Sequence, residues 1–140
     1  KCHYTGSDIS KEMINSGKKQ IGLKKINLQN LNLLEIKDKK LLKSLKADYV
    51  VANGLFTVKS TLTNNYWWSY TKKMLEKMFL LTNECLIFNM MKNNVDFKDR
   101  HLYYQQTDKL IKFLEKKLSK KIVIKSDYPL YEYMCYVYKK

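Results

Sequence analysis

A continuous apolar segment at residues 47–56, which ends in an Asn-Gly pair, limits the folds open to this chain. Tyrosine and two valines follow one another there without polar alternation. Such runs are typical of a buried strand in a parallel sheet, where both faces are covered. Because open α/β sheets bind ligands beyond the carboxyl ends of their strands, we expect a ligand beside Asn53 and Gly54.

The segments before it alternate between strand and helix patterns. Residues 2–7 are expected to be extended and to lead into Asp8, and a helix follows for which Asp8 or Ser10 can serve as the N-cap. Two apolar residues are expected on the buried side of this helix: Met13 and Ile14. Residues 26–31 alternate apolar and polar side chains and predict the next strand, and a lysine-rich short helix or loop then leads to residue 47.

The second half of the chain predicts two longer helices. Apolar residues recur at spacings of three and four from about Tyr66 to Leu81, which indicates a helix with one packed face. Its expected core positions are Trp67, Tyr70, Met74, Leu75, Met78 and Phe79. Residues 85–91 form a compact apolar run of strand length, and Thr107 is the expected N-cap of a further helix.

A hairpin closes the chain. Residues 121–125 and 130–138 have strand composition, and residues 126–129, Ser-Asp-Tyr-Pro, form the turn between them. Strands joined by so short a turn must be antiparallel. We therefore expect an α/β layered sheet with an antiparallel last strand, in one domain that covers residues 1–140.

The formal net charge of +14 raises nucleic acid or an acidic surface as a partner. Nearly all of this charge is lysine, and Arg100 is the only arginine, although arginine is the residue that favours bidentate contacts to phosphates and bases. AT-rich codons explain a composition rich in Lys, Asn, Ile and Tyr equally well. Nucleic acid is therefore considered but not favoured.

The cysteines and histidines show no metal-binding pattern. Cys2, Cys85 and Cys135 lie far apart and lack Cys-x-x-Cys spacing, so free buried thiols are expected, and His3 and His101 add no ligand cluster. No apolar run is long enough to span a membrane, and no signal-peptide pattern opens the chain. These features favour a cytoplasmic location.

Three segments taken together resemble a known family. Residues 4–13, Tyr-Thr-Gly-Ser-Asp-Ile-Ser-Lys-Glu-Met, are followed by residues 32–35, Asn-Leu-Leu-Glu, and by residues 47–54, Ala-Asp-Tyr-Val-Val-Ala-Asn-Gly. Their order and spacing resemble the middle and end of a class I S-adenosylmethionine-dependent methyltransferase, a Rossmann-like fold. Residues 127–132 and the hairpin resemble the end of one bacterial branch of that family.

The resemblance implies that S-adenosylmethionine is the cofactor and indicates which residues bind it. Asp8, with Ile9 beside it, occupies the position of the acid that holds the ribose hydroxyls in that family. Asn32 lies where the adenine amino group is received, and Leu33 would pack on the adenine face; a register shift of two would place Asn30 there instead. Without the family, an N-cap at Asp8 and a turn at Asn32 are the alternatives.

The other site residues follow from the same comparison. Asn53 and Gly54 would lie beside the methionine part and the methyl group, although Gly54 also suits an ordinary turn. The candidates on the substrate side, for which packing or turn formation is the alternative, are Tyr103, Tyr104, Asp127 and Tyr128. No catalytic base is identified, since His101 has the pattern of a surface histidine.

The family's glycine-rich loop after its first strand has no counterpart in residues 1–140. A shortened chain, a separate partner segment and an incomplete sequence all explain this, and we favour the C-terminal portion of a longer enzyme. In this family the first strand neighbours the strand at residues 47–52, so an exposed apolar edge is expected there. A missing N-terminal segment or a partner chain would cover it.

The resemblance implies direct, in-line methyl transfer to an oxygen or nitrogen, which depends mainly on alignment. No Asn-Pro-Pro-Tyr-type motif follows residue 52, which argues against a nucleobase amino group and favours a small-molecule or saccharide acceptor. The competing hypothesis is a non-catalytic basic module that binds RNA or an acidic partner. Binding of S-adenosylhomocysteine separates the two.

Overall fold

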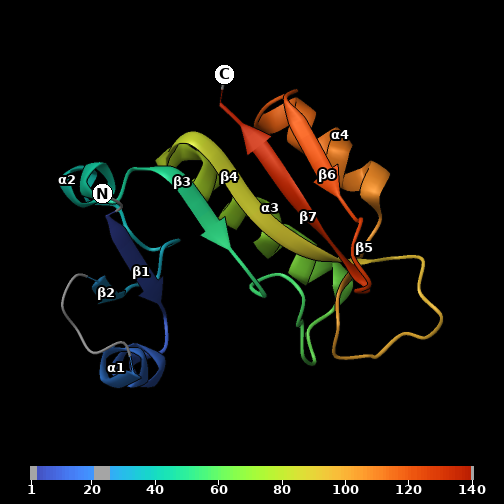
Figure 1. The fold of residues 1–140 in the computed structure, drawn as a ribbon, viewed down its shortest axis with the longest axis horizontal. Coiled ribbons are helices and arrows are strands. Elements are labelled where there is room, and N and C mark those ends of the chain that lie inside the picture. Colours follow the sequence, from blue (N-terminus) through green and yellow to red (C-terminus); the bar gives the residue numbers. More distant parts are fainter. Residues whose placement is uncertain (1–2, 21–25, 140) are drawn as a thin grey trace. The chain divides into compact units, whose positions relative to one another are not determined.

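The computed structural model describes residues 3–20 and 26–139, so Cys2 lies outside the described residues. The chain forms two compact units, Lys1–Leu45 (unit 1) and Lys46–Lys140 (unit 2). Unit 1 is coloured from blue to cyan in Figure 1, and unit 2 from green to red. We describe each unit by itself, and a single partial methyltransferase domain over residues 1–140 stays a prediction.

Unit 1 is a small parallel β-α-β element followed by a short helix. Its elements are β1 (Tyr4–Asp8), α1 (Lys11–Gln20), β2 (Ile26–Asn30) and α2 (Lys39–Ser44). β1 pairs with β2 in parallel, with Asp8 opposite Asn30, so both strands end at the same edge. The lysine-rich stretch is a helix because the Asp38 carboxylate accepts hydrogen bonds from two N–H groups of the first turn of α2.

The start of α1 follows the sequence in part. Ser10 caps the helix, since its Oγ accepts the Met13 N–H at 3.2 Å. Ile14 is buried as predicted, but the prediction for Met13 is wrong, because its side chain is 63% exposed. Neighbouring helical residues point about 100° apart, so only one of the two can face the two-stranded sheet.

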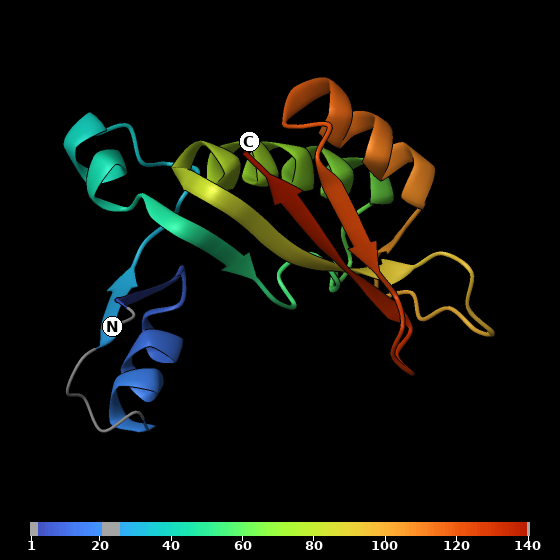
Figure 2. The same cartoon turned by 45° about the horizontal axis from the view of Figure 1, so that its top comes forward.

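Unit 2 contains a mixed sheet. Its elements are β3 (Ala47–Ala52), α3 (Asn64–Leu81), β4 (Thr82–Lys92), β5 (Tyr104–Gln105), α4 (Thr107–Lys117), β6 (Ile122–Lys125) and β7 (Glu132–Tyr138). The strand order is β3-β4-β7-β6, and the short β5 also pairs with β4. β7 is antiparallel to both neighbours, which confirms the predicted closing hairpin, and Figures 1 and 2 show its arrow running against those of β4 and β6.

Helices α3 and α4 cover one face of this sheet (Figure 2). They meet where the Trp68 and Phe113 rings pack edge to face, with centroids 5.5 Å apart. Four of the predicted core residues of α3 are buried: Met74, Leu75, Met78 and Phe79. The prediction is wrong for Trp67 and Tyr70, which are half-buried, whereas the adjacent Trp68 and Thr71 are buried; Trp67 donates its indole N–H to the Phe56 carbonyl at 3.0 Å. The N-cap of α4 is also corrected, since Thr107 is its first helical residue and Gln106 precedes it.

β3 differs most from its prediction. It was expected to be buried on both faces, yet Tyr49 and Val51 are 63% and 60% exposed. Within the described part of unit 2, β3 pairs with β4 alone, which leaves its other edge without a strand partner. An exposed apolar strand therefore stands at one end of the sheet.

Two general features bear on function. Among the described residues, no helix combines the length and the apolar character that crossing a membrane requires. Within residues 3–20 and 26–139, no three His, Cys, Asp or Glu side chains are grouped so that they could hold a metal ion. Cys85 and Cys135 are free and buried, as expected.

Candidate active site

The turn after β3 lies at the carboxyl edge of the unit 2 sheet. Gly54 has φ +78°, a conformation that favours glycine, and a Cβ added there would meet no atom within 4 Å. Its N–H donates to Asn89 Oδ1 at 2.7 Å, and its carbonyl accepts the Thr57 hydroxyl at 3.0 Å. Two hydrogen bonds thus fix the backbone at Gly54, while the space on the side where a Cβ would lie is open.

Asn89, on β4, holds this turn. It is only 2% exposed, and its Nδ2 donates to a carboxylate oxygen of Glu132 on β7 at 2.6 Å. Glu132 therefore orients the Asn89 amide so that its oxygen faces Gly54. The sequence analysis missed both residues, although a lone asparagine inside an apolar strand signals a buried side chain that needs hydrogen-bond partners.

The predicted cofactor residues of unit 1 gather at the carboxyl edge of its two strands. Asp8 and Ile9 are exposed, and Asp8 Oδ1 accepts the Ser10 N–H at 2.7 Å. The Asn30 amide donates to the Asp8 and Ile9 carbonyls at 3.0 and 2.8 Å, which ties the end of β1 to the end of β2. Asn30 was only the alternative to Asn32, and its contacts make it a support of the loop at Asp8.

The loop after β2 contains the other two candidates of unit 1. Asn32 Oδ1 accepts the Leu34 N–H at 3.3 Å, an Asx-type turn contact, and Leu33 is half-buried. The turn role weighed for Asn32 is therefore present. A contact to adenine stays a prediction for Asn32 and Leu33.

The paired tyrosines before α4 have different surroundings. Tyr103 is buried and donates its hydroxyl to Gln105 Oε1 at 2.6 Å. Burial raises the pKa of Tyr103 to about 12, so it stays a neutral donor at physiological pH. Tyr104 is half-buried and lines an open pocket of about 420 Å³, where its hydroxyl accepts the Asp99 N–H at 2.9 Å.

Asp127 and Tyr128 lie in the turn that joins β6 and β7. Asp127 is exposed, whereas the hydroxyl of the half-buried Tyr128 is enclosed and makes no hydrogen bond within the described structure. Burial, and secondarily the charge of Glu132, raises the pKa of Tyr128. His101 is exposed, and its backbone carbonyl accepts the Lys59 and Ser60 N–H groups, so its visible role is structural.

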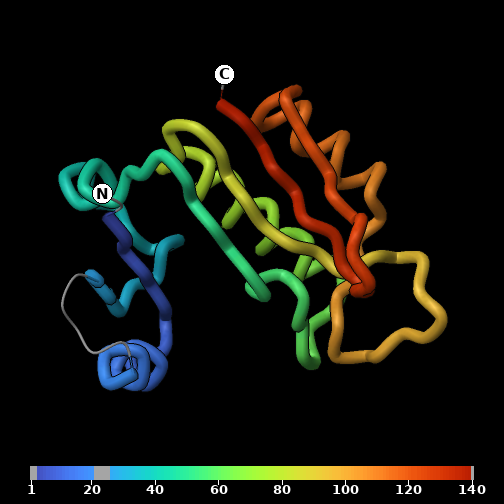
Figure 3. Tube along the Cα trace, in the orientation of Figure 1, coloured from blue at the N-terminus to red at the C-terminus, as the bar shows by residue number. Residues whose placement is uncertain are grey.

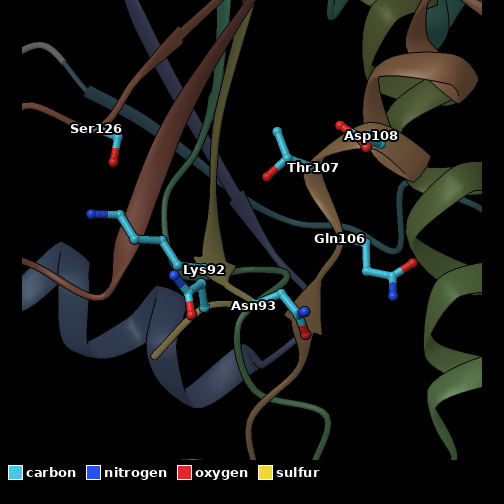
Figure 4. A pocket seen from close by; sticks show the side chains of 7 residues that line it. Lys92, Asn93, Gln106, Thr107, Asp108 and Ser126 are labelled. Atoms are coloured by element: carbon cyan, nitrogen blue, oxygen red, sulfur yellow. The ribbon is translucent and has the colours of Figure 1, made fainter. Parts of the chain in front are cut away.

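A larger open pocket, of about 620 Å³, lies at the same edge of unit 2 (Figure 4). It is formed by the end of β4, the start of α4 and the residue after β6. Its lining residues, six of which are labelled in Figure 4, are Lys92, Asn93, Asn94, Gln106, Thr107, Asp108 and Ser126. None was predicted as a site residue, but Ser126 directly precedes Asp127.

Known proteins with a similar sequence or fold bear on this site. No family model matches the chain. The chain is 26% identical over 141 aligned residues to a Mycobacterium tuberculosis protein named "Putative methyltransferase Rv1506c", and the match covers 99% of the chain and 80% of that protein.

Several solved methyltransferases have a similar fold. The magnesium protoporphyrin IX methyltransferase of Synechocystis PCC 6803, solved with bound SAM, matches 97% of the chain with a TM-score of 0.61 and 14% identity. The N-methyltransferase NodS of Bradyrhizobium japonicum WM9, in complex with S-adenosylhomocysteine, matches 96% with a TM-score of 0.60 and 11% identity. The chain spans 59% and 65% of these two proteins.

These two solved proteins hold S-adenosylmethionine or its product S-adenosylhomocysteine, and the strand order and the antiparallel β7 of this chain agree with the fold expected from the sequence. The chain has a class I S-adenosylmethionine-dependent methyltransferase-like fold.

Proposed function

We propose that this chain is the C-terminal part of the catalytic domain of a methyltransferase. It would transfer a methyl group from S-adenosylmethionine to an oxygen or nitrogen of a small-molecule or saccharide acceptor. The observation that carries the proposal is the open Gly54 turn, which Asn89 holds at the carboxyl edge of a methyltransferase-like sheet. The bacterial and cytoplasmic setting stays a prediction from the sequence.

The residues present fit the cofactor chemically. Asp8 is exposed, and a carboxylate that accepts one backbone N–H has further acceptor sites for two ribose hydroxyls. Ile9 and Leu33 supply apolar surface for the adenine, and Asn32 supplies an amide for its polar edge. Asn53 and Gly54 would border the methionine part, where the absence of a Gly54 side chain permits close approach.

The cofactor would supply a methyl group on a sulfonium sulfur, and the residues of this chain would align the acceptor with it. Tyr103, Tyr104, Asp127 and Tyr128 are the proposed acceptor-side residues. Tyr103 is a rigid, neutral hydroxyl group, because Gln105 and burial fix its position and its protonation state. We assign no catalytic base, since alignment alone supplies much of the acceleration in such transfers.

The exposed strand β3 supports the proposal that a further segment, from the same protein or a partner chain, completes the sheet. Tyr49 and Val51 are apolar groups that a neighbouring strand and its helix would cover. A strand that adds to this edge would bring the missing glycine-rich loop to the carboxyl side, next to Asn53 and Gly54.

Isothermal titration of the complete protein with S-adenosylhomocysteine tests the cofactor site. We expect one site, and a loss of affinity of at least about tenfold in Asp8→Ala, since two hydrogen bonds to a charged group are removed. Glu12→Ala is the matched control, because Glu12 is an exposed acid in the first turn of α1 and should bind normally. Absence of binding to the wild-type protein refutes the proposal.

Titration with RNA tests the competing hypothesis of a non-catalytic basic module. The net charge of +14 predicts weak, salt-dependent association with any polyanion. Steeply salt-dependent RNA binding in a protein that ignores S-adenosylhomocysteine would support the non-catalytic basic module instead.

A further inference from the structure

The described residues that line the 620 Å³ pocket at the carboxyl edge of unit 2 are all polar or charged. They carry three amides, two hydroxyls, one ammonium and one carboxylate, and no aliphatic or aromatic residue is among them. These groups provide hydrogen-bond donors and acceptors together. Pockets for flat, apolar ligands are instead lined mainly by hydrophobic and aromatic side chains.

The charges of this lining balance. Among the lining residues that the structure describes, Lys92 is the one cation and Asp108 the one anion. The pocket therefore lacks the excess positive charge that would select a phosphate or a carboxylate, in spite of the net charge of +14 on the whole chain. Its composition fits a neutral ligand with many hydroxyl groups.

Two exposed aromatic rings are connected to one residue of this lining, Lys92, through the backbone of Tyr131. Phe97 and Tyr131 are 71% and 48% exposed, and their rings pack edge to face with centroids 6.1 Å apart. The Tyr131 hydroxyl donates to Asp96 at 2.7 Å, and the Tyr131 carbonyl accepts the N–H of the pocket residue Lys92 at 2.9 Å. Phe97 belongs to the long loop that follows β4 in Figure 3.

We infer that this pocket and the Phe97–Tyr131 pair bind a neutral saccharide, which is the methyl acceptor. A sugar ring has apolar C–H faces, which stack on aromatic rings, and a rim of hydroxyls, which need amides and other hydroxyls as partners. The exposed pair supplies the first surface and the polar pocket the second. The inference rests on the proposed function and names its acceptor class. Of the acceptor-side residues proposed above, Asp127 directly follows the lining residue Ser126, whereas Tyr104 lines the other pocket, of about 420 Å³.

Substitution of Gln106 is the best test of the contacts between the pocket and the hydroxyls of a bound sugar. Gln106 is exposed, lines the pocket and makes no side-chain cap to α4, so its amide is not needed to hold the helix. Gln106→Ala therefore removes one donor and one acceptor from the pocket with little effect on folding. Phe97→Ala similarly removes an exposed ring from the aromatic pair.

An array of neutral and acidic oligosaccharides, probed with the complete protein, tests the inference. We expect retention of a subset of neutral glycans, with half-saturation about tenfold higher in Phe97→Ala and Gln106→Ala. Leu130→Ala is the matched control, because Leu130 is 55% exposed beside Tyr131 but lacks a ring, and it should change binding less than about twofold. Thermal melts of the three variants establish that each is folded.

Three results would overturn the inference: the wild-type protein retains no glycan, it prefers acidic glycans, or Phe97→Ala and Gln106→Ala both bind glycans as the wild type does. Titration with S-adenosylhomocysteine in parallel separates this failure from that of the proposed function. A protein that binds S-adenosylhomocysteine but no neutral glycan keeps the methyltransferase proposal and loses the saccharide acceptor. A protein that binds neutral glycans but not S-adenosylhomocysteine keeps the saccharide site and loses the methyltransferase proposal.

Discussion

Replacing Asn89 should loosen the turn on which the cofactor site depends. Asn89→Ala removes the acceptor of the Gly54 N–H, at 2.7 Å, and the donor to the Glu132 carboxylate, at 2.6 Å. A neutral hydrogen bond contributes about 1 kcal/mol and one to a charged group about 2 kcal/mol, so the free energy of unfolding should fall by about 3 kcal/mol. Urea denaturation of the complete protein measures this change.

A double substitution tests whether the contact itself is responsible. Asn89→Asp keeps the acceptor for Gly54 but places a second carboxylate against Glu132, and should destabilise by about 2–3 kcal/mol. Adding Glu132→Gln restores a donor opposite that carboxylate, so the double variant should recover at least about 1 kcal/mol of the loss. Asn83→Ala is the control, because Asn83 is an exposed β4 asparagine bonded to Asp48 at 3.2 Å, and it should cost less than about 0.5 kcal/mol.

The reasoning would be refuted if Asn89→Ala changed the stability no more than Asn83→Ala. It would also be refuted if the effects of the two substitutions at residues 89 and 132 were additive. In the first case the buried amide does not hold the turn, and in the second Glu132 does not orient it. Weaker binding of S-adenosylhomocysteine by Asn89→Ala would further connect the turn to the cofactor.

Three further substitutions have calculable effects. Gly54→Ala should cost about 1 kcal/mol in urea denaturation, because the φ of +78° strains any residue with a Cβ, and an unchanged or higher stability would contradict this. Trp68→Ala should cost about 3–5 kcal/mol through lost packing on Phe113, whereas the exposed Tyr66→Ala should be nearly neutral by the same assay. Burial raises the pKa of Cys135 from 9.0 to about 12, so the folded state favours the neutral thiol; this stability is full below pH 9 and is lost as the pH rises toward 12. Between about pH 8 and 10 the wild-type protein should therefore lose about 1.4 kcal/mol more than Cys135→Ala, and equal losses would count against the raised pKa.

Helical periodicity and turn chemistry predicted most of the elements. The repeat of apolar residues gave a helix that the structure places at α3 (Asn64–Leu81), and the short turn before Leu130 required the antiparallel β7. Both signals are local, so neither depends on the surrounding fold. The error of one position at Trp67 and Trp68 arose because adjacent tryptophans fit the same periodic pattern.

The burial of the strand faces and the buried polar contacts were harder to predict. The apolar run at β3 resembles a buried strand, but burial depends on a neighbour that local sequence does not specify, so Tyr49 is exposed. The link from Gly54 through Asn89 to Glu132 joins residues 35 and 43 positions apart, and only the strand register brings them together. The same holds for the polar pocket, whose lining comes from three elements that meet at one sheet edge.

Titration of the complete protein with S-adenosylhomocysteine, followed residue by residue by NMR, tests the central claim most directly. We predict that the amide signals of Asp8, Ile9, Asn53 and Gly54 shift together and saturate at one ligand per chain. The signals of Leu118 and Ser119, at the far end of α4, should stay in place. Shifts that avoid Asp8 and Gly54, or no shifts at saturating ligand, would contradict the account.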